Sequence, residues 1–218
     1  MHIGILGGTG PAGSALAARL AAVDFEVTIG SRSKERAQEV CSSICDKWPD
    51  RALALRAGDN TMAADADLVV VATPWDAAAA TAVSVCDQLE GKVVVSMANA
   101  LVKVGNEFQP LVPPRGSVAT HVQSSVPRAM VAAAFHHLPA HALAKLDAPV
   151  ESDVLICSDF PEAYDATAAI VERIPNLRPL DAGSLSNAAP IEAITAVLLQ
   201  LNVRYKTRTA LRLTGIDL

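Results

Sequence analysis

The sequence has no excess of basic residues, and this narrows the partners that it can bind. It carries 18 Lys and Arg against 23 Asp and Glu, a formal net charge of −5. Domains that bind nucleic acids usually present a strongly basic surface. We therefore expect no nucleic-acid partner.

Long apolar runs are also missing. The alanine-rich stretch AAAATAVSVC falls well short of the roughly 18 uncharged apolar residues that a membrane span requires. The first residues, MHIGILGGTG, have neither the charged region nor the long apolar core of a secretion signal. We expect a cytoplasmic protein with no membrane partner.

Metal-binding patterns are absent as well. The four cysteines, Cys41, Cys45, Cys86 and Cys157, form no Cys-x-x-Cys pair, which predicts small buried thiols in a reducing compartment. His137 and His141 have helical spacing, but Pro139 lies between them and no acid or cysteine nearby completes a ligand set. We expect no metal site.

What the sequence does contain is a regular alternation of strand-like and helix-like segments over its first half. The segment DLVVVAT has no polar alternation, which is typical of a parallel strand covered on both faces. The order predicts an α/β fold with a doubly wound, mainly parallel sheet of the Rossmann type. The predicted strands are 2–6, 25–30, 52–57, 67–73 and 92–97, and the predicted helices are 11–22, 33–46 and 75–89.

The second half has a less regular rhythm. PLVPPRG predicts a turn-rich loop, and the chain from Ser184 onward has the apolar spacing of a helix, with Pro190 tolerated in its first turn. Between these segments we expect helices at 117–126 and 161–173 and strands at 129–135, 153–158 and 177–183.

A glycine-rich turn follows the first strand. Gly8, Gly10 and Gly13 have Gly-x-Gly-x-x-Gly spacing between a strand and a helix. In dinucleotide-binding folds these glycines permit a tight turn, a close approach of the pyrophosphate and close helix–strand packing. Thr9 can add a hydroxyl donor, and Pro11 suits the first turn of the helix. The turn predicts a dinucleotide site.

The end of the second strand is basic. An acid in this position binds the ribose 2′-hydroxyl in NAD proteins, but here the chain has Ser31, Arg32, Lys34 and Arg36. Arginine can bind a 2′-phosphate with paired donors, which favours NADP over NAD. The alternative is that Ser31 or Ser33 only caps the next helix and the cations are solvated.

With these residues in place, the chain resembles the NADPH-dependent coenzyme F420 reductases. The resemblance is carried by GILGGTGPAGSALAARLA, GSRSKERA, TPWDAA, FHHLPAHALAKLD and LRPLDAGSLSNA. It implies an NADP-binding Rossmann domain at residues 1–180, a C-terminal helical segment at 181–218 that completes the acceptor cleft, and a cytoplasmic homodimer. The cofactors implied are NADP(H) and coenzyme F420.

The resemblance also assigns site residues. It places Thr9, Gly10, Pro11 and Ala12 at the pyrophosphate, Ser31, Arg32 and Arg36 at the 2′-phosphate, Thr73 and Pro74 beside the nicotinamide ribose, and Asn99 near the nicotinamide. His136, Leu138 and Ala140 would line the site near both rings, and Ser186 and Asn187 would lie near the deazaflavin. Residues 97–118 and the C-terminal tail depart from the family pattern, so the acceptor side is less well defined than the donor side.

The implied reaction is hydride transfer between NADP(H) and the deazaflavin, which needs no catalytic residue of the protein. One alternative is an NADPH oxidoreductase that uses a flavin or a metal chelate as acceptor. Another is a 2-hydroxy-acid or imine reductase, although we find no lysine in a convincing catalytic motif. A third is a non-enzymatic NADP-sensing protein.

Overall fold

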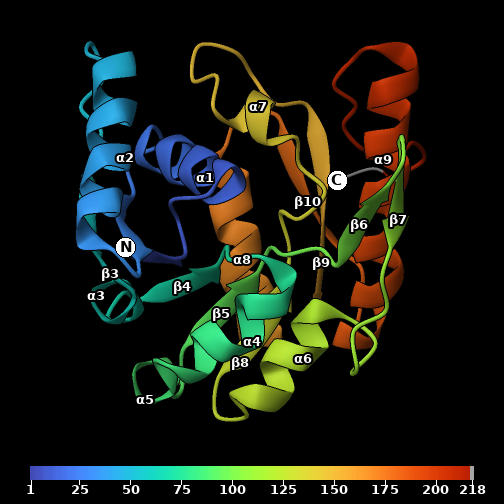
Figure 1. The fold of residues 1–218 in the computed structure, drawn as a ribbon, viewed down its shortest axis with the longest axis horizontal. Helices are drawn as coiled ribbons and strands as arrows, with labels where there is room; N and C mark the ends of the chain where they lie inside the picture. Colours follow the sequence, from blue (N-terminus) through green and yellow to red (C-terminus); the bar gives the residue numbers. More distant parts are fainter. Residues whose placement is uncertain (217–218) are drawn as a thin grey trace.

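The protein is built on an eight-stranded sheet (Figure 1). The computed structural model describes residues 1–216. The strand order is β10-β9-β8-β5-β4-β1-β2-β3. The strands are β1 (His2–Leu6), β2 (Glu26–Ser31), β3 (Leu55–Asp59), β4 (Leu68–Val71), β5 (Val93–Ser96), β8 (Met130–Ala133), β9 (Ser152–Ser158) and β10 (Leu177–Asp181).

Six neighbouring strands, from β3 to β8, run parallel. Their carboxyl ends therefore meet at one edge of the sheet, where ligands bind in open α/β folds. β9 pairs antiparallel to β8, and β10 is parallel to β9. The predicted doubly wound, mainly parallel sheet is confirmed.

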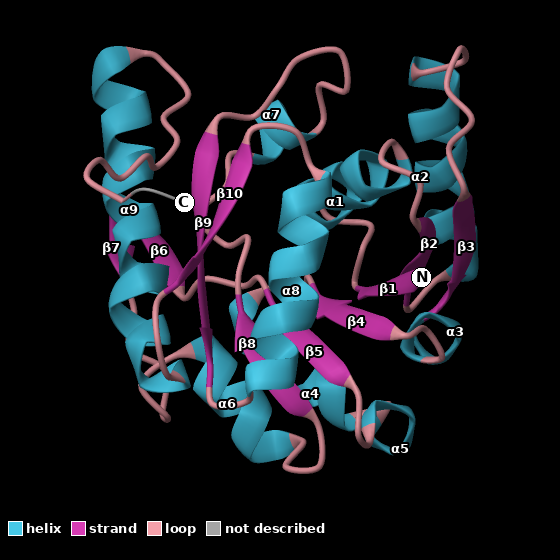
Figure 2. Cartoon of the chain, turned by 180° about the vertical axis from the view of Figure 1, so that it is seen from behind, coloured by secondary structure: helices cyan, strands magenta, loops and turns pink. Residues whose placement is uncertain are grey.

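Helices cover both faces of the sheet, and each face has its own apolar core. α1, α2 and α8 pack on one face (Figure 2), and α3, α4, α6 and the start of α9 pack on the other. Every residue of β4 is buried, because alternate side chains enter the two cores. The helices are α1 (Pro11–Ala21), α2 (Lys34–Lys47), α3 (Asn60–Ala64), α4 (Trp75–Val83), α5 (Cys86–Leu89), α6 (Val118–Ser125), α7 (Ala140–Leu143), α8 (Pro161–Arg173) and α9 (Ala188–Tyr205), with a 3₁₀ turn η1 (Leu185–Asn187).

Several parts of the chain differ from the prediction. The helix expected at 75–89 is divided, because Val85 leaves the helical region with a φ of −132° and buries its side chain. The short helices α3 and α7 were not predicted. Neither was the antiparallel hairpin of β6 (Leu101–Val104) and β7 (Glu107–Pro110), which stands apart from the main sheet and packs on α9.

α9 ends at Tyr205, short of the helix expected from Ser184 onward, and residues 206–216 return to the sheet without forming a helix. The carbonyl of Leu211 accepts from the Asp153 backbone N–H at 2.7 Å, at the part of β9 that extends beyond β8. The buried carboxylate of Asp153 accepts from Arg178 at 2.7 and 2.9 Å, from Arg212 at 3.4 Å and from the Leu213 backbone N–H. These bonds fasten the tail to β9 and β10.

The cysteines are only partly as predicted. Cys41 and Cys157 are buried, and burial raises the pKa of each thiol to about 11. Cys45 and Cys86 are exposed, so the prediction of buried thiols was wrong for these two, which lie on outward faces of α2 and α5. Within residues 1–216, no helix combines the length and apolar composition that crossing a membrane requires. The same residues contain no cluster of three His, Cys, Asp or Glu side chains that could hold a metal ion.

Candidate functional site

The glycine turn joins β1 to α1 at the carboxyl edge of the sheet. A Cβ added to Gly13 would lie 2.9 Å from the Gly8 Cα and 3.0 Å from the Ala72 Cβ, so Gly13 permits close packing of α1. A Cβ on Gly8 would meet the Ile5 carbonyl at 3.0 Å. A Cβ on Gly10 would meet nothing nearer than 3.9 Å. The protein itself therefore does not require glycine at position 10, whereas a ligand that approached the backbone there would.

A pocket of about 370 Å³, here called the phosphate pocket, opens beside this turn. It brings together seven of the predicted residues: Thr9, Gly10, Ser31, Arg32, Arg36, Thr73 and Pro74. The remaining lining residues are Gly7, Asn60, Ala72, Ala77 and Thr81. The turn at the end of β1 and the basic end of β2 thus face one cavity.

The two arginines at the basic corner of this pocket differ in whether they form an ion pair. Arg36 pairs with Glu39 at 3.2 Å, and both side chains are exposed. Arg32 is exposed and forms no ion pair with an acid among residues 1–216. Ser33 caps α2 by accepting from the Arg36 N–H at 3.2 Å, so the capping alternative applies to Ser33. Ser31 is buried beneath the pocket, and its Oγ accepts from the Ser33 N–H at 3.2 Å.

Asn60 is a lining residue that sequence reasoning missed. Its Oδ1 accepts from the Gly7 backbone N–H at 3.2 Å. Gly7 has a φ of 65°, a conformation that favours glycine. Asn60 therefore holds the start of the turn from the end of β3, and its position directly after that strand is the signal that could have identified it.

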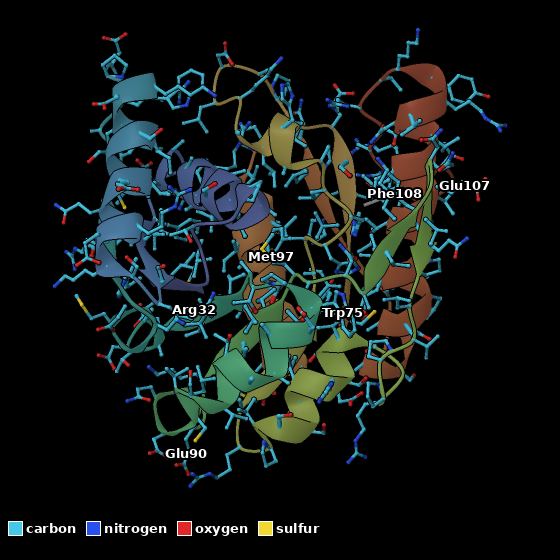
Figure 3. All side chains as sticks on the ribbon, in the orientation of Figure 1. Arg32, Trp75, Glu90, Met97, Glu107 and Phe108 are labelled. Carbon is cyan, nitrogen blue, oxygen red and sulfur yellow. The ribbon has the colours of Figure 1, made fainter. Side chains whose placement is uncertain are left out.

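A second cavity of about 320 Å³, here called the strand-end pocket, lies beyond the carboxyl ends of β4 and β5. It shares Gly10, Ala72, Thr73 and Pro74 with the phosphate pocket, so the two cavities adjoin. Figure 3 shows Met97 between Arg32 on one side and Trp75 on the other. The full lining is Gly10, Pro11, Ala12, Ala72, Thr73, Pro74, Trp75, Met97, Ala98, Asn99 and Leu101. None of these side chains is an acid or a base at neutral pH.

Thr73 stands at the junction of the two cavities. Its Oγ1 is buried and has no hydrogen-bond partner among the described residues. Buried hydroxyl groups are nearly always satisfied by protein, water or a ligand. A polar group of a ligand that crosses from one cavity to the other would supply the missing partner.

Asn99 lines the strand-end pocket with its amide already engaged. Its Nδ2 donates to the His136 carbonyl at 2.7 Å, and its Oδ1 accepts from the Thr195 hydroxyl at 3.2 Å. Asn99 therefore joins the ends of β5 and β8 to α9 at the cavity wall. Thr195 was not predicted as part of the site, because an isolated threonine on an apolar helix carries no sequence signal.

His136 and His137 lie under this edge of the sheet and are buried. Phe135, just before them, has a φ of 64°, which is uncommon for a bulky residue. Burial, aided by the adjacent His137, lowers the pKa of His136 to about 3, and neither ring nitrogen has a partner within residues 1–216. His137 Nε2 lies 2.8 Å from the Asp153 carbonyl, and burial also lowers its pKa. Both imidazoles are neutral at physiological pH.

Some predicted residues do not join either cavity. His136 and Leu138 are buried behind the wall, and Ala140 begins the short helix α7. Ser186 and Asn187 lie in η1, before α9, where Ser186 bonds to Ser184 and Asn187 Nδ2 donates to the Ala182 carbonyl. Thr195, which bonds to Asn99 in the wall of the strand-end pocket, is eight residues beyond the end of η1, so about two helical turns separate η1 from this wall.

Glu192, on α9, contacts α6 from the same side of the sheet as Thr195. Its buried carboxylate accepts from the backbone N–H groups of Val118 and Ala119 at 2.9 and 3.1 Å. These two bonds cap the N-terminus of α6. Burial raises the pKa of Glu192 to about 7, against the lowering effect of the two N–H groups.

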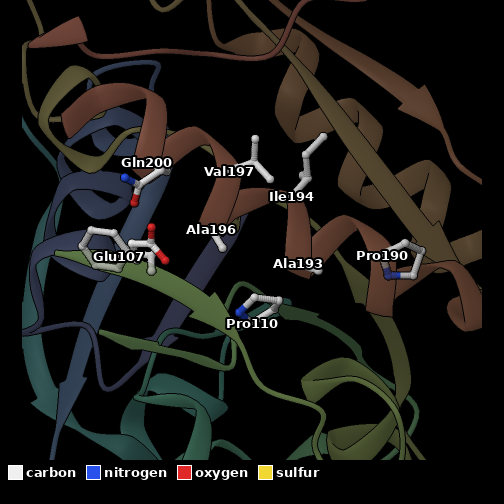
Figure 4. A pocket seen from close by; sticks show the side chains of 9 residues that line it. Glu107, Pro110, Pro190, Ala193, Ile194, Ala196, Val197 and Gln200 are labelled. Atoms are coloured by element: carbon white, nitrogen blue, oxygen red, sulfur yellow. The ribbon is translucent and has the colours of Figure 1, made fainter. Parts of the chain in front are cut away.

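A third hollow, here called the hairpin groove, lies between β7 and α9 on the outside of the molecule. It has a volume of about 640 Å³. Figure 4 shows Glu107 and Gln200 at one end and Pro190 toward the other. Its walls are mainly apolar, formed by Phe108, Pro110, Pro190, Ala193, Ile194, Ala196 and Val197.

Comparisons with known proteins place this chain among described enzymes. A family model described as NADP oxidoreductase, coenzyme F420-dependent, matches residues 2–100. An F420-dependent NADP reductase from Methanocaldococcus jannaschii is 34% identical over 224 residues, and the alignment covers 100% of both chains. A second one, from Methanothermobacter thermautotrophicus, is 34% identical over 99% of this chain and 96% of its own.

Among solved structures, a candidate F420-dependent NADP reductase from Arthrobacter sp. FB24 superposes with a TM-score of 0.82. It covers 97% of this chain and 98% of its own at 22% identity, which supports the fold alone. The full-length identity with the two archaeal enzymes is the stronger finding. The chain belongs to the family of F420-dependent NADP reductases.

Proposed function

We propose that this protein transfers a hydride between NADP(H) and the deazaflavin coenzyme F420. The observation that carries the proposal, together with family membership, is the pair of adjoining pockets. One has a cationic end, and the other is lined by small, apolar and uncharged residues. This is the arrangement expected for a dinucleotide whose phosphates lie at one end and whose reactive ring lies at the other.

In this proposal the phosphate pocket binds and orients the donor. The open space over Gly10 admits the pyrophosphate, and the N–H groups at the start of α1 face its charge. Arg32 and Arg36 bind the 2′-phosphate, with Arg32 free to do so and Arg36 exchanging its exposed pair with Glu39. Thr73 supplies a hydroxyl where the two pockets meet.

The strand-end pocket would hold the reacting rings and exclude water from them. When bound, the two substrates themselves supply the hydride donor and acceptor. Trp75, Met97 and Leu101 can exclude water, and Ala12 and Ala98 leave room for flat rings. Because no lining side chain titrates near neutral pH, the wall offers no general acid or base, and direct hydride transfer needs none.

The defining experiment mixes the purified protein with NADPH and oxidised F420 and follows the loss of deazaflavin absorbance. We expect turnover with F420 and none with free flavin or a ferric chelate in its place. Turnover with flavin alone would support the alternative acceptor. Binding of NADPH without turnover of any of these acceptors would support a sensor.

The cofactor preference has its own test in the double variant Arg32→Ala/Arg36→Ala. Losing two charge-assisted contacts to a phosphate should raise the KM for NADPH roughly 100-fold and leave the KM for NADH within about twofold. Lys34→Ala is the control, because Lys34 is also exposed but does not line the pocket. Equal losses with both cofactors would refute the 2′-phosphate assignment.

The proposal includes a homodimer. It is supported by the apolar hairpin groove and by α9 residues that are half exposed, such as Val197 and Val203. Sedimentation equilibrium at micromolar concentration should give twice the chain mass, and Val197→Glu should shift it toward one chain. A single-chain mass for the unmodified protein would contradict the dimer.

A further inference from the structure

The C-terminal part of the chain differs in charge from the rest. The protein has a net charge of −5, yet residues 193–218 contain four cations, Arg204, Lys206, Arg208 and Arg212, against a single acid, Asp217. Arg212 is bound to Asp153. The other three are exposed, and none forms an ion pair with an acid among residues 1–216. The segment therefore presents local positive charge on an acidic protein.

Hydrogen bonds connect this segment to the strand-end pocket. Asn99 in the pocket wall bonds to Thr195 on α9, and Leu198 lies one turn further along that helix. The Leu198 carbonyl accepts from the Thr209 hydroxyl at 3.2 Å, because the chain folds back along α9 after Tyr205. Arg208, adjacent to Thr209, therefore lies beside α9 about one helical turn from Thr195.

The helix sets the distance to the other two cations. Arg204 is nine residues beyond Thr195, which at 1.5 Å per residue corresponds to about 14 Å along the axis. Lys206 follows as the C-terminal cap. Favourable interaction with the helix dipole accounts for a cation in the last turn, such as Arg204. It does not account for Arg208, which lies beyond the end of α9.

We propose that Arg204, Lys206 and Arg208 form an anion-binding rim, here called the cationic rim, for the charged side chain of the deazaflavin substrate. The inference rests on the proposed function. Coenzyme F420 carries a phosphodiester and glutamyl carboxylates on a flexible chain that leads away from its ring. A ring in the strand-end pocket would place that chain within reach of a rim that begins about one helical turn beyond Thr195 and extends to about 14 Å from it.

The test compares F420 with its ring fragment, which lacks the phosphodiester and the glutamyl groups. In the triple variant Arg204→Gln/Lys206→Gln/Arg208→Gln, the KM for F420 should rise about tenfold at low salt, since three partly screened contacts are lost. The KM for the ring fragment and the KM for NADPH should change less than about twofold. A triple variant of exposed cations elsewhere, Lys47→Gln/Arg56→Gln/Arg128→Gln, removes the same charge and should leave all three values unchanged.

The unmodified protein provides a second measurement that does not depend on folding of a variant. Its KM for F420 should increase with ionic strength more steeply than its KM for the ring fragment, and more steeply for long glutamyl chains than for short ones. Equal salt dependence, or equal effects of the rim variant on both substrates, would overturn the rim while leaving hydride transfer in place. Absence of turnover with both substrates would overturn the proposed function and the rim with it.

Discussion

The buried carboxylate of Glu192 makes the free energy of unfolding depend on pH in a predictable direction. Its pKa is raised from 4.5 to about 7 in the folded protein, because burial outweighs the two backbone N–H groups of α6 that the carboxylate accepts from. A group with a raised folded pKa stabilises the protein fully below its unfolded pKa, and this stabilisation is lost as the pH rises through the folded pKa. Glu192→Gln removes the titration and keeps one acceptor oxygen.

The magnitude follows from the folded and unfolded pKa values of Glu192. Between about pH 5 and pH 8 the native protein should lose about 2.5 kcal/mol of stability relative to the Glu192→Gln variant, because a difference of one in pKa corresponds to about 1.36 kcal/mol. The absolute stability of the variant does not matter to this comparison. Only the change in the difference between the two proteins is used.

Urea denaturation of both proteins, followed by circular dichroism at pH 5, 6, 7 and 8, measures that difference. We expect the unfolding free energy of the native protein minus that of the variant to fall steadily as the pH rises. Parallel curves would mean that Glu192 has an ordinary pKa. A difference that grows in favour of the native protein would mean that the N–H groups of α6 outweigh burial, and would refute the reasoning.

Three further predictions concern other parts of the molecule. Between pH 7 and pH 5 the native protein should lose about 2 kcal/mol of its free energy of unfolding through His136, because the lowered folded pKa of this residue stabilises the fold only above the unfolded pKa of 6.5. His136→Phe should abolish this loss, and unchanged pH dependence in urea titrations at both pH values would contradict it. Gly10→Ala should raise the KM for NADPH and leave the melting temperature unchanged, whereas Gly13→Ala should lower the free energy of unfolding by about 1–3 kcal/mol. Steady-state kinetics and calorimetry of both variants measure these effects, and the reverse pattern would contradict both. Asp153→Ala should lower the free energy of unfolding by about 2 kcal/mol, less than the loss of a fully buried ion pair, because the arginine partners of Asp153 reach water. The variant should also be cleaved faster by trypsin in the tail, and an unchanged cleavage rate would show that other contacts hold the tail.

The first half of the fold could be predicted because its signals are local. β4 is a continuous apolar run, Pro11 marks the start of α1, and the three glycines fix a turn whose geometry only a few residues determine. The basic end of β2 could be predicted to face a cavity on the same grounds, since the end of a parallel strand lies at the binding edge.

The second half depends on contacts between distant segments. The β6–β7 hairpin has largely exposed residues and is positioned by α9, which lies far along the chain, so its own sequence does not specify it. The apolar pattern of β9 likewise does not indicate that this strand runs antiparallel to β8. Because β9 and β10 reverse direction, the residues that follow β10 emerge away from the carboxyl edge of β4 and β5, which is why Ser186 and Asn187 lie apart from the strand-end pocket.

The tail that crosses β9 also has a consequence for synthesis. Until residues 188–213 have left the ribosome, the N-terminus of α6 lacks Glu192, Asn99 lacks Thr195 and the buried Asp153 carboxylate lacks Arg212. The glycine turn lies early in the chain, whereas the wall of the strand-end pocket and the N-terminus of α6 stay incomplete until α9 has emerged. A chain that is stalled before α9 should therefore expose these unpaired groups to chaperones and proteases.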